Sequence, residues 1–359
     1  MSYVLAFLGF AALIILHEAG HFAAAKAVGM RVERFALFFP PLIARLRRGE
    51  TEYAIGSIPL GGYVRITGMN PHEELDPEVA PRAYFNQPVW KRIVTIAAGP
   101  AVNIVLALVL LTIVYSVWGA GTGRVTDRVA SVDPRMPAAG QILAGDRIVA
   151  VDGVRGNADA LRRQVATHKC AGAATAGCRA TSAALVTVRR NGTERQLHIT
   201  PVYVASAQRV LLGYSYAEQR RDVGVPEAVT LSADGTWRFT RGTVEIIAGI
   251  FQADKREQIS GVVGSYESTR QAIQLSTESA LTLLALISLS LGVINLFPFL
   301  PLDGGHIFWA VAEKVRGRAI PFSVMERAGF IGFALVIALF MVGLTNDIGR
   351  LTGEGITVR

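Results

Sequence analysis

The residues best suited to chemistry are a histidine–glutamate–histidine group near the N-terminus. They are His17, Glu18 and His21, in the pattern HExxH. In a helix, residues i and i+4 share a face, so both imidazoles can bind one metal ion. Glu18 lies about 100° around the helix from His17, close enough to act on a metal-bound water. Catalytic zinc takes three protein ligands and keeps one open position, so the pattern predicts a zinc site that needs one more ligand.

The motif lies at the end of one apolar run, residues 3–16, and before another, residues 22–25. About 20 residues are needed to cross a bilayer, and this helix reaches that length only by including both histidines. Ionisable side chains in a membrane helix are costly and usually functional. We therefore expect the metal to lie within the membrane region. The alternative is a set of polar residues at a helix end that face water.

The composition is too apolar for a typical soluble domain. Of 359 residues, 51% are hydrophobic and only 18% are charged, which indicates several membrane spans. The net charge of +8 comes from scattered basic residues. This pattern argues against nucleic-acid binding and favours basic loops beside membrane spans. The N-terminus lacks a basic region and a small-residue cleavage site, so we expect a retained span rather than a signal peptide.

The sequence predicts a polytopic α-helical membrane protein. Its four transmembrane helices are expected at residues 3–28, 93–118, 280–300 and 329–345. Two intervening segments, 29–92 and 307–328, are rich in lysine and arginine. The positive-inside rule therefore makes both cytoplasmic and puts both termini outside.

The loop 29–92 has its own structure in this prediction. Residues 51–58 and 63–66 have the pattern of two short strands, joined by a turn at residues 59–62 that contains Gly61 and Gly62. Apolar residues are also unusually frequent from 35 to 43. A β-hairpin dipping into the membrane beside the site would explain these features. An amphipathic sheet on the membrane surface would explain them equally well.

The candidate third ligand is Asp303. It lies where Pro298, Pro301 and a glycine pair break the third span, and a broken helix at membrane depth is tolerated where it lines a cavity. The rival acids lie in the polar segment 29–92, where acids are expected: Glu33, Glu50 and Glu52. His306 is either a secondary partner of the site or a residue that starts a helix.

The second span carries a further polar group. Its sequence Gly99-Pro100-Ala101-Val102-Asn103 places a proline and an asparagine within an apolar helix. The proline frees backbone groups and allows a kink. Asn103 is expected to face the protein interior or a water pocket. An interhelical hydrogen bond without a catalytic role explains it as well.

Residues 124–205 have the composition of a small soluble α+β domain. Its strands are predicted at residues 124–132, 147–151, 184–189 and 194–200, with a helix at 158–167. Residues 137–153 resemble the signature of bacterial PDZ domains, which bind extended peptides against a sheet edge. We expect one extracytoplasmic PDZ domain. A connecting segment with interfacial helices, residues 206–279, follows it.

The two cysteines, Cys170 and Cys178, both lie in this domain. If the domain is extracytoplasmic, a disulfide between them is plausible. The alternative is a pair of free thiols in a disordered insertion.

Three motifs follow one another along the chain, with a PDZ domain before the last: His17-Glu18-x-x-His21, Gly99-Pro100-x-x-Asn103 and Asn295…Asp303-Gly304. This arrangement resembles the site-2 protease family of intramembrane zinc metalloproteases. The bacterial regulator of sigma-E protease type is the most similar. The resemblance implies one Zn²⁺ ion bound by His17, His21 and Asp303, with Glu18 as general base. It also implies that a hairpin at Gly61 and Gly62 holds the unwound substrate, and that Asn103 and Asn295 line the site.

The resemblance further implies the substrates and the location. The family cuts transmembrane segments of single-span proteins, such as clipped anti-sigma factors or signal-peptide remnants, in the bacterial inner or cell membrane. The PDZ domain would bind a peptide or substrate tail. This chain departs in having one PDZ domain where the type usually has two, and in placing Pro298 and Pro301 three residues apart. The alternatives are a metal transporter and an inactive scaffold that binds through its PDZ domain.

Overall fold

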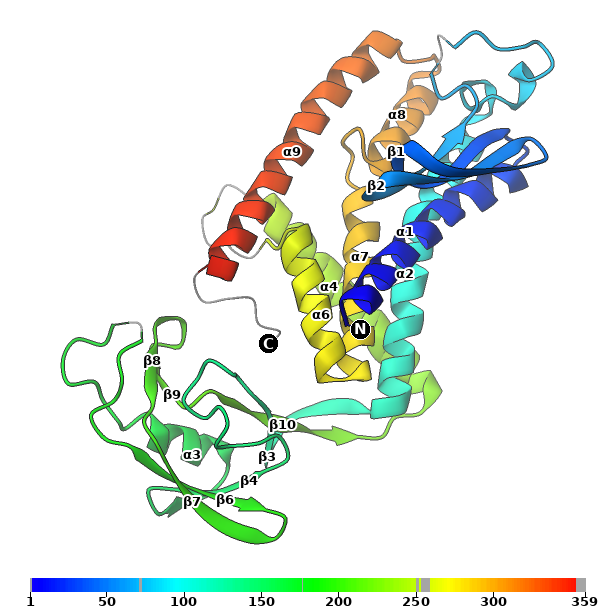
Figure 1. The fold of residues 1–359 in the computed structure, drawn as a ribbon. Coiled ribbons are helices and arrows are strands. Elements are labelled where there is room, and N and C mark those ends of the chain that lie inside the picture. Colours follow the sequence, from blue (N-terminus) through cyan, green and yellow to red (C-terminus); the bar gives the residue numbers. More distant parts are fainter. Residues whose placement is uncertain (1, 71–72, 176, 250–251, 253–258, 353–359) are drawn as a thin grey trace. The chain divides into compact units, whose positions relative to one another are not determined.

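The computed structural model describes residues 2–70, 73–175, 177–249, 252 and 259–352. The chain divides into two compact units (Figure 1). Unit 1 comprises Met1–Val117 and Gly224–Arg359, and unit 2 comprises Trp118–Val223. Unit 2 is thus inserted between the second and third long apolar helices of unit 1.

Unit 1 is mainly helical. Its long helices are α1 (Ser2–Ala27), α2 (Val89–Trp118), α7 (Thr277–Asn295) and α9 (Phe322–Thr352). Its shorter elements are α4 (Val225–Ala248), α6 (Val262–Leu275), α8 (Asp303–Arg316), η1 (Ala80–Arg82) and η2 (Tyr84–Asn86). Within the described residues, four helices are long and apolar enough to cross a membrane, and they fall where the four spans were predicted.

Two boundaries differ from the prediction. The third span ends at Asn295 rather than at residue 300, because the chain leaves the helix before the first proline. The segment 307–328 is not a loop. Helix α8 occupies residues up to Arg316, and α9 already begins at Phe322, so only a short turn remains between them. The buried face of α8 begins with the glycine pair and continues to Ala310, which explains why a basic segment is helical.

The two strands of unit 1 are both bent and form four arms. Strand β1 (Val32–Arg48) was not predicted, and strand β2 (Thr51–Ile66) runs through the predicted turn at residues 59–62. Leu37 pairs with both Gly62 and Ile55, so the first arm of β1 lies between the two arms of β2. The order of the arms across the sheet is 42–48, 51–56, 32–37 and 62–66.

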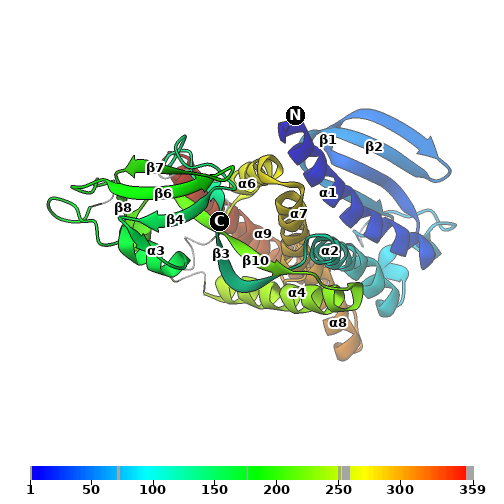
Figure 2. The same ribbon diagram turned by 90° about the horizontal axis from the view of Figure 1, so that it is seen from below.

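This sheet has one apolar face. Phe22 of α1 contacts Phe35 and Tyr53 at ring-centroid distances of 5.5 and 5.9 Å, so the apolar face packs on α1. Both views of the ribbon show the sheet beside this helix (Figures 1 and 2). Because side chains alternate along a strand, the neighbouring row points away from α1. That row contains Arg34 and Glu52, whose side chains lie 3.2 Å apart.

The helices around the site pack closely. A Cβ on Gly20 of α1 would lie 2.6 Å from the carbonyl oxygen of Ala98 in α2, so the two helices touch at this glycine. A buried apolar cluster joins α2 to α7; it contains Ala107, Leu111, Ala285, Leu289 and Val293. The start of α2 is tied to α8 by Arg92, whose guanidinium donates to both carboxylate oxygens of Glu313 at 2.6 and 3.0 Å.

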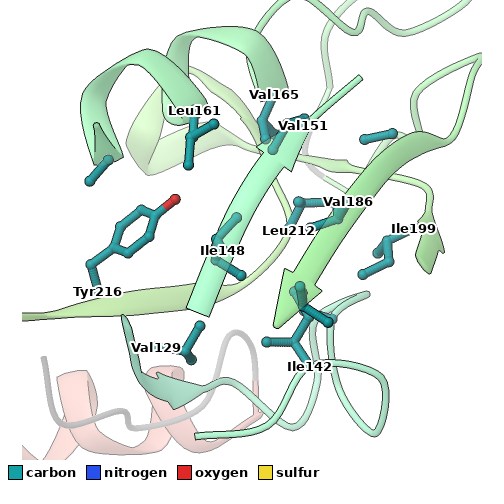
Figure 3. Packing of buried hydrophobic residues seen from close by; sticks show 14 residues of the cluster. Val129, Ile142, Ile148, Val151, Leu161, Val165, Val186, Ile199, Leu212 and Tyr216 are labelled. Carbon is teal, nitrogen blue, oxygen red and sulfur yellow. The ribbon is translucent and has the colours of Figure 1, made fainter. Parts of the chain in front are cut away.

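In its described residues, unit 2 contains a six-stranded sheet, a separate pair of strands and one α-helix. The sheet order is β10-β3-β4-β6-β7, with β5 paired to β4. The elements are β3 (Ala120–Val132), β4 (Arg147–Val151), β5 (Val154–Arg155), α3 (Ala158–Val165), β6 (Ala184–Arg190), β7 (Thr193–Ile199), the pair β8 (Val202–Val204) and β9 (Arg209–Leu211), η3 (Ala205–Ala207), and β10 (Tyr214–Arg221). The core lies between sheet and helix, where Leu161, Ile148 and Val186 are fully or almost fully buried (Figure 3). The unit is wider than the predicted range 124–205, because β10 pairs with β3.

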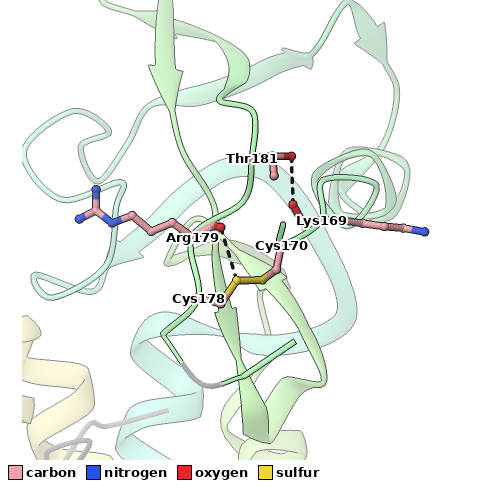
Figure 4. The surroundings of a disulfide bond; sticks show 5 residues. All are labelled: Lys169, Cys170, Cys178, Arg179 and Thr181. Atoms are coloured by element: carbon pink, nitrogen blue, oxygen red, sulfur yellow. Dashed lines mark hydrogen bonds between the residues drawn. A yellow bond between two sulfur atoms is a disulfide. The ribbon is translucent and has the colours of Figure 1, made fainter. Parts of the chain in front are cut away.

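The cysteines of unit 2 are joined. Cys170 and Cys178 form a disulfide with a Cα–Cα distance of 6.2 Å (Figure 4). Beside it, Cys170 forms a β-bridge with Ala180, and the amide of Tyr203 donates to the carbonyl oxygen of Cys178. The loop between the cysteines is therefore anchored at both ends, as expected for the disulfide rather than for a free insertion.

Candidate active site

Three predicted ligands converge in unit 1. Nε2 of His17 and Nε2 of His21 each lie 3.3 Å from Oδ2 of Asp303, and the two nitrogens are 3.3 Å apart. Both histidines are buried on α1, and Asp303 is the first residue of α8. Among the described residues, these three form the one group of His, Cys, Asp or Glu side chains with metal-binding geometry.

The geometry of this triangle fits zinc. In a regular tetrahedron, the distance from centre to corner is about 0.61 of the edge. An ion with these three atoms at corners would lie about 2.0 Å from each, and zinc bonds to nitrogen and oxygen are about 2.0–2.2 Å long. Oδ2 of Asp303 is also buried without a hydrogen-bond donor, although a buried carboxylate oxygen normally has a partner. The set of three protein donors suits a catalytic zinc ion, which keeps one further position for water.

The outer nitrogen of each histidine is also engaged. Nδ1 of His21 lies 2.9 Å from the carbonyl oxygen of Thr95, and Nδ1 of His17 lies 3.0 Å from Nδ2 of Asn103. Both contacts come from α2. They orient the rings so that both Nε2 atoms face Asp303. Sequence reasoning missed Thr95, because a backbone acceptor leaves no signal in the residue type.

Asp303 is positioned by the break between α7 and α8. The chain turns through residues 296–302, and its backbone then passes against the first turn of α8. A Cβ on Gly304 would lie 2.1 Å from the carbonyl oxygen of Leu296, and one on Gly305 would lie 2.5 Å from the amide nitrogen of Leu300. The glycine pair therefore lets the turn lie flat on the helix that carries Asp303. A carboxylate in the first turn also suits the positive end of a helix.

Glu18 faces the sheet beside the three ligands. A Cβ on Gly62 would lie 2.9 Å from Cγ of Glu18 and 3.0 Å from the carbonyl oxygen of Ala36. The structure thus brings Gly62 to the carboxylate predicted as the base. A Cβ on Gly61, the neighbouring glycine, would instead meet the ring of Phe39 at 3.0 Å.

The other predicted residues differ in their surroundings. Asn103 is 0% exposed, whereas Asn295, the last residue of α7, is half-buried. Within the described part of the chain, the side chain of Asn295 makes no hydrogen bond. His306 lies outside the ligand group and lines a small cavity with Tyr84 and Trp309. The rival acids also lie elsewhere: Glu33 bonds with Thr67, Glu50 with Arg82, and Glu52 with Arg34.

An ion-pair cluster fastens the sheet at the far end of α1. Glu50, in the turn between β1 and β2, accepts hydrogen bonds from the two terminal nitrogens of the Arg82 guanidinium at 2.8 Å and from Lys26 at 2.7 Å. These hydrogen bonds lower the pKa of Glu50 from 4.5 to about 2, and those from Arg82 make the largest contribution. The cluster joins the last turn of α1 to the β1–β2 turn, and so supports the position of the sheet relative to the site.

The comparison with protein families places the chain in a family. The model of Peptidase family M50 matches residues 5–339. The chain belongs to Peptidase family M50. The match includes both histidines of the HExxH motif and Asp303, and it extends across unit 2. The M50 chain is a zinc metalloprotease, as its motifs predict, and its four long apolar helices fit a membrane protein.

Individual relatives agree with this family. The protein named zinc metalloprotease Rip1 from Mycobacterium bovis is 30% identical over 395 residues, covering 93% of this chain and 94% of the relative. Rip1 from Mycobacterium tuberculosis is 29% identical with the same coverage. A relative from Rhizobium meliloti, also named as a zinc metalloprotease, is 28% identical over 367 residues, covering 95% of this chain and 94% of the relative.

A solved structure gives a weaker comparison for unit 2. The PDZ domain of an SdrC-like protein from Listeria innocua covers 28% of this chain and 99% of its own length, with 17% identity. Its TM-score of 0.22 is too low to assign a fold. The PDZ domain therefore remains a prediction from the sequence.

Proposed function

We propose that this M50 protease cleaves peptide bonds within or beside the transmembrane segment of single-span membrane proteins. His17, His21 and Asp303 hold the zinc ion, and Glu18 is the general base. The observation that carries the proposal is the triangle of three ligand atoms with 3.3 Å edges, formed by residues of an apolar helix and of a helix break.

Bound zinc supplies a Lewis acid that activates water and polarises the scissile carbonyl. Glu18 accepts the proton of the attacking water and passes it to the leaving amine. Its position beside the ligand triangle suits this role. Burial of the site excludes bulk water, which strengthens each electrostatic contact with the reacting groups.

The substrate is held as an added strand on the sheet. A transmembrane helix hides its carbonyl groups in internal hydrogen bonds, so it must unwind before it is cut, and strand addition replaces those bonds. The arm 62–66 of β2 lies at one edge of the sheet, and no described strand pairs with its outer side. This arm lies next to Glu18, because Gly62 has no side chain to separate them.

Asn295 is the better candidate for a contact with the substrate carbonyl. Its half-buried side chain makes no hydrogen bond within the described residues, whereas the Asn103 amide is enclosed and faces His17. An amide donor near the developing oxyanion would stabilise the transition state. Gly61 and Gly62 lie where the arm 62–66 begins, and the missing side chain of Gly62 leaves room for Glu18.

The protein lies in the bacterial inner or cell membrane, with termini and unit 2 outside and the β1–β2 sheet on the cytoplasmic side. The disulfide between Cys170 and Cys178 supports this orientation, because such bonds persist in oxidising compartments. Unit 2 acts as a PDZ domain that binds a peptide or substrate tail and filters substrates. Deleting it should change which substrates are cut without removing the chemistry.

The test is cleavage of a single-span substrate, already trimmed on its outer side, by purified protein in detergent, with zinc content measured in parallel. Glu18→Gln should keep one zinc ion and lose cleavage by at least about 100-fold, since general acid–base catalysis contributes 10²–10⁴-fold. Asp303→Ala should lose both zinc and cleavage. An active Glu18→Gln variant, or full zinc occupancy in Asp303→Ala, would overturn these assignments.

A further inference from the structure

Among the described residues, the side chain of Asn103 makes one hydrogen bond, and its partner is the outer nitrogen of His17. Asn103 is 0% exposed, and its Nδ2 lies 3.0 Å from Nδ1 of His17. Helix α7 closes the space behind it. The hydroxyl of Ser288 donates to the carbonyl oxygen of Asn103 at 2.9 Å, and a Cβ on Gly292 would lie 3.2 Å from Cβ of Asn103. The amide is therefore enclosed between three helices.

His21 shows which proton arrangement the site requires. Its Nδ1 faces the carbonyl oxygen of Thr95, which can only accept a hydrogen bond. A neutral imidazole carries one proton, so His21 holds that proton on Nδ1 and presents the lone pair of Nε2 to the other ligands. His17 can bind the same ion through Nε2 only if it also carries its proton on Nδ1. The group that faces this nitrogen must then accept.

Asn103 has one accepting end and one donating end. In the structure the donating Nδ2 faces His17, while Oδ1 is buried without a hydrogen-bond partner. The Oδ1 atom and the Nδ2 group have nearly the same size, so a rotation of the side-chain amide by half a turn exchanges them without moving α2. The exchange gives Oδ1 a partner and leaves the Nε2 lone pair of His17 free.

We infer that Asn103 is a positioning residue: in the zinc-loaded enzyme its Oδ1 accepts a hydrogen bond from Nδ1–H of His17 and fixes the ring with Nε2 towards the metal. The inference rests on the zinc site proposed above. Under this inference, the two histidines differ in the acceptor that holds their rings. The acceptor of His21 is a backbone carbonyl that no substitution removes, whereas His17 depends on one side chain. Loss of such a partner typically weakens metal affinity 10–100-fold.

The experiment measures zinc affinity of the full-length protein in detergent by competition with a chelator. Asn103→Leu keeps the volume and removes the hydrogen bond, so it should bind zinc about 10–100-fold more weakly than the wild type. Asn103→Asp has only acceptors and should stay close to the wild type. Ser288→Ala is the matched control, because it removes a contact with the backbone of Asn103 and leaves His17 untouched; its affinity should not change.

Cobalt provides a second readout that packing alone would not change. The visible absorption of the Co²⁺-loaded protein reports ligand geometry, so the spectrum should shift in Asn103→Leu and be restored in Asn103→Asp. If the leucine variant does not fold, Asn103→Ala replaces it, because that change only removes atoms.

Two results would overturn the inference while leaving the zinc site intact: equal zinc affinity in wild type and Asn103→Leu, or an Asn103→Asp variant as weak as Asn103→Leu. A wild-type protein that binds no zinc would be a different failure, because it would refute the proposed metal site and this inference together.

Discussion

Gly99 of α2 lies directly against His21 of α1: a Cβ at position 99 would lie 2.2 Å from Nε2 of His21 and 2.6 Å from its Cε1. No side chain fits between this helix and the ligand nitrogen. The ring cannot swing away without losing the contact of its Nδ1 with Thr95. We therefore expect Gly99→Ala to lower zinc affinity by at least the roughly 10–100-fold seen when a histidine ligand loses its support.

Zinc titration of the purified variant checks this prediction. Gly9→Ala is a suitable control, because it makes the same change in another long apolar helix, and its Cβ would meet only the end of the Leu284 side chain at 3.0 Å. Normal zinc affinity in Gly99→Ala would mean that the helices separate easily at this point.

Gly62→Ala should affect catalysis rather than metal binding. The new methyl group would lie 2.9 Å from Cγ of Glu18 and would also contact Ile14, so the carboxylate must move. Displacement of a catalytic group by about 1 Å can cost about 100-fold in rate. We expect kcat to fall by about that factor with zinc content unchanged. Gly242→Ala in α4, where no atom lies within 4 Å of the new Cβ, is the control. Loss of zinc in Gly62→Ala would contradict this reading.

Arg92→Leu should destabilise unit 1. Arg92 is 3% exposed and its guanidinium holds both oxygens of Glu313, so its removal leaves a carboxylate without its partner. Breaking one side of a buried ion pair costs about 3–5 kcal/mol, and we expect the lower end because Glu313 is partly exposed. Thermal unfolding in detergent measures the loss. The double variant Arg92→Leu/Glu313→Leu should recover part of it, and an additive result would show that the pair is not coupled.

Glu50 should give a pH dependence to the stability. Its pKa in the folded protein is about 2, against an ordinary value of 4.5. A lowered pKa means that the stabilisation is complete above about pH 4.5 and is lost as the pH falls towards 2. The difference in Tm between wild type and Glu50→Gln should be constant above pH 5 and shrink through that window. Glu74→Gln, at an exposed carboxylate of the same loop, should show no such trend. A difference that grows on acidification would contradict the assignment.

The three proposed ligands could be selected from the sequence because each is indicated by its residue type and its neighbours. The HExxH spacing places His17 and His21 on one helix face, and the prolines and glycines around Asp303 indicate a break in an apolar helix. The family membership and the zinc ion were predicted from these features and are confirmed. The positions of the four long apolar helices followed from hydrophobicity alone, since a long apolar run has few alternatives.

The supporting contacts were not predictable, because they join distant parts of the chain. Arg92 and Glu313 are 221 residues apart, and nothing in either sequence neighbourhood indicates the other. Strand β1 was not predicted, because Pro40, Pro41 and several arginines obscure the residue pattern expected of a strand. The prolines are accommodated where the strand bends. The contact between Asn103 and His17 depends on how α1 crosses α2. The sequence therefore left two roles open for this asparagine.

The break between α7 and α8 separates a helix of membrane length from the helix that carries Asp303. Helix α7 has 19 residues and is about 28 Å long, close to the thickness of a hydrocarbon layer, and it packs on α2 through the buried apolar cluster. Asp303 does not belong to that helix. It starts α8, which is fastened to α2 through Arg92, and the connecting turn is held by Gly332 of α9, where a Cβ would lie 1.7 Å from the carbonyl oxygen of Leu300. The carboxylate is therefore kept beside the histidines by contacts with α2 and α9, and a shift of α7 is not passed to it along one continuous helix.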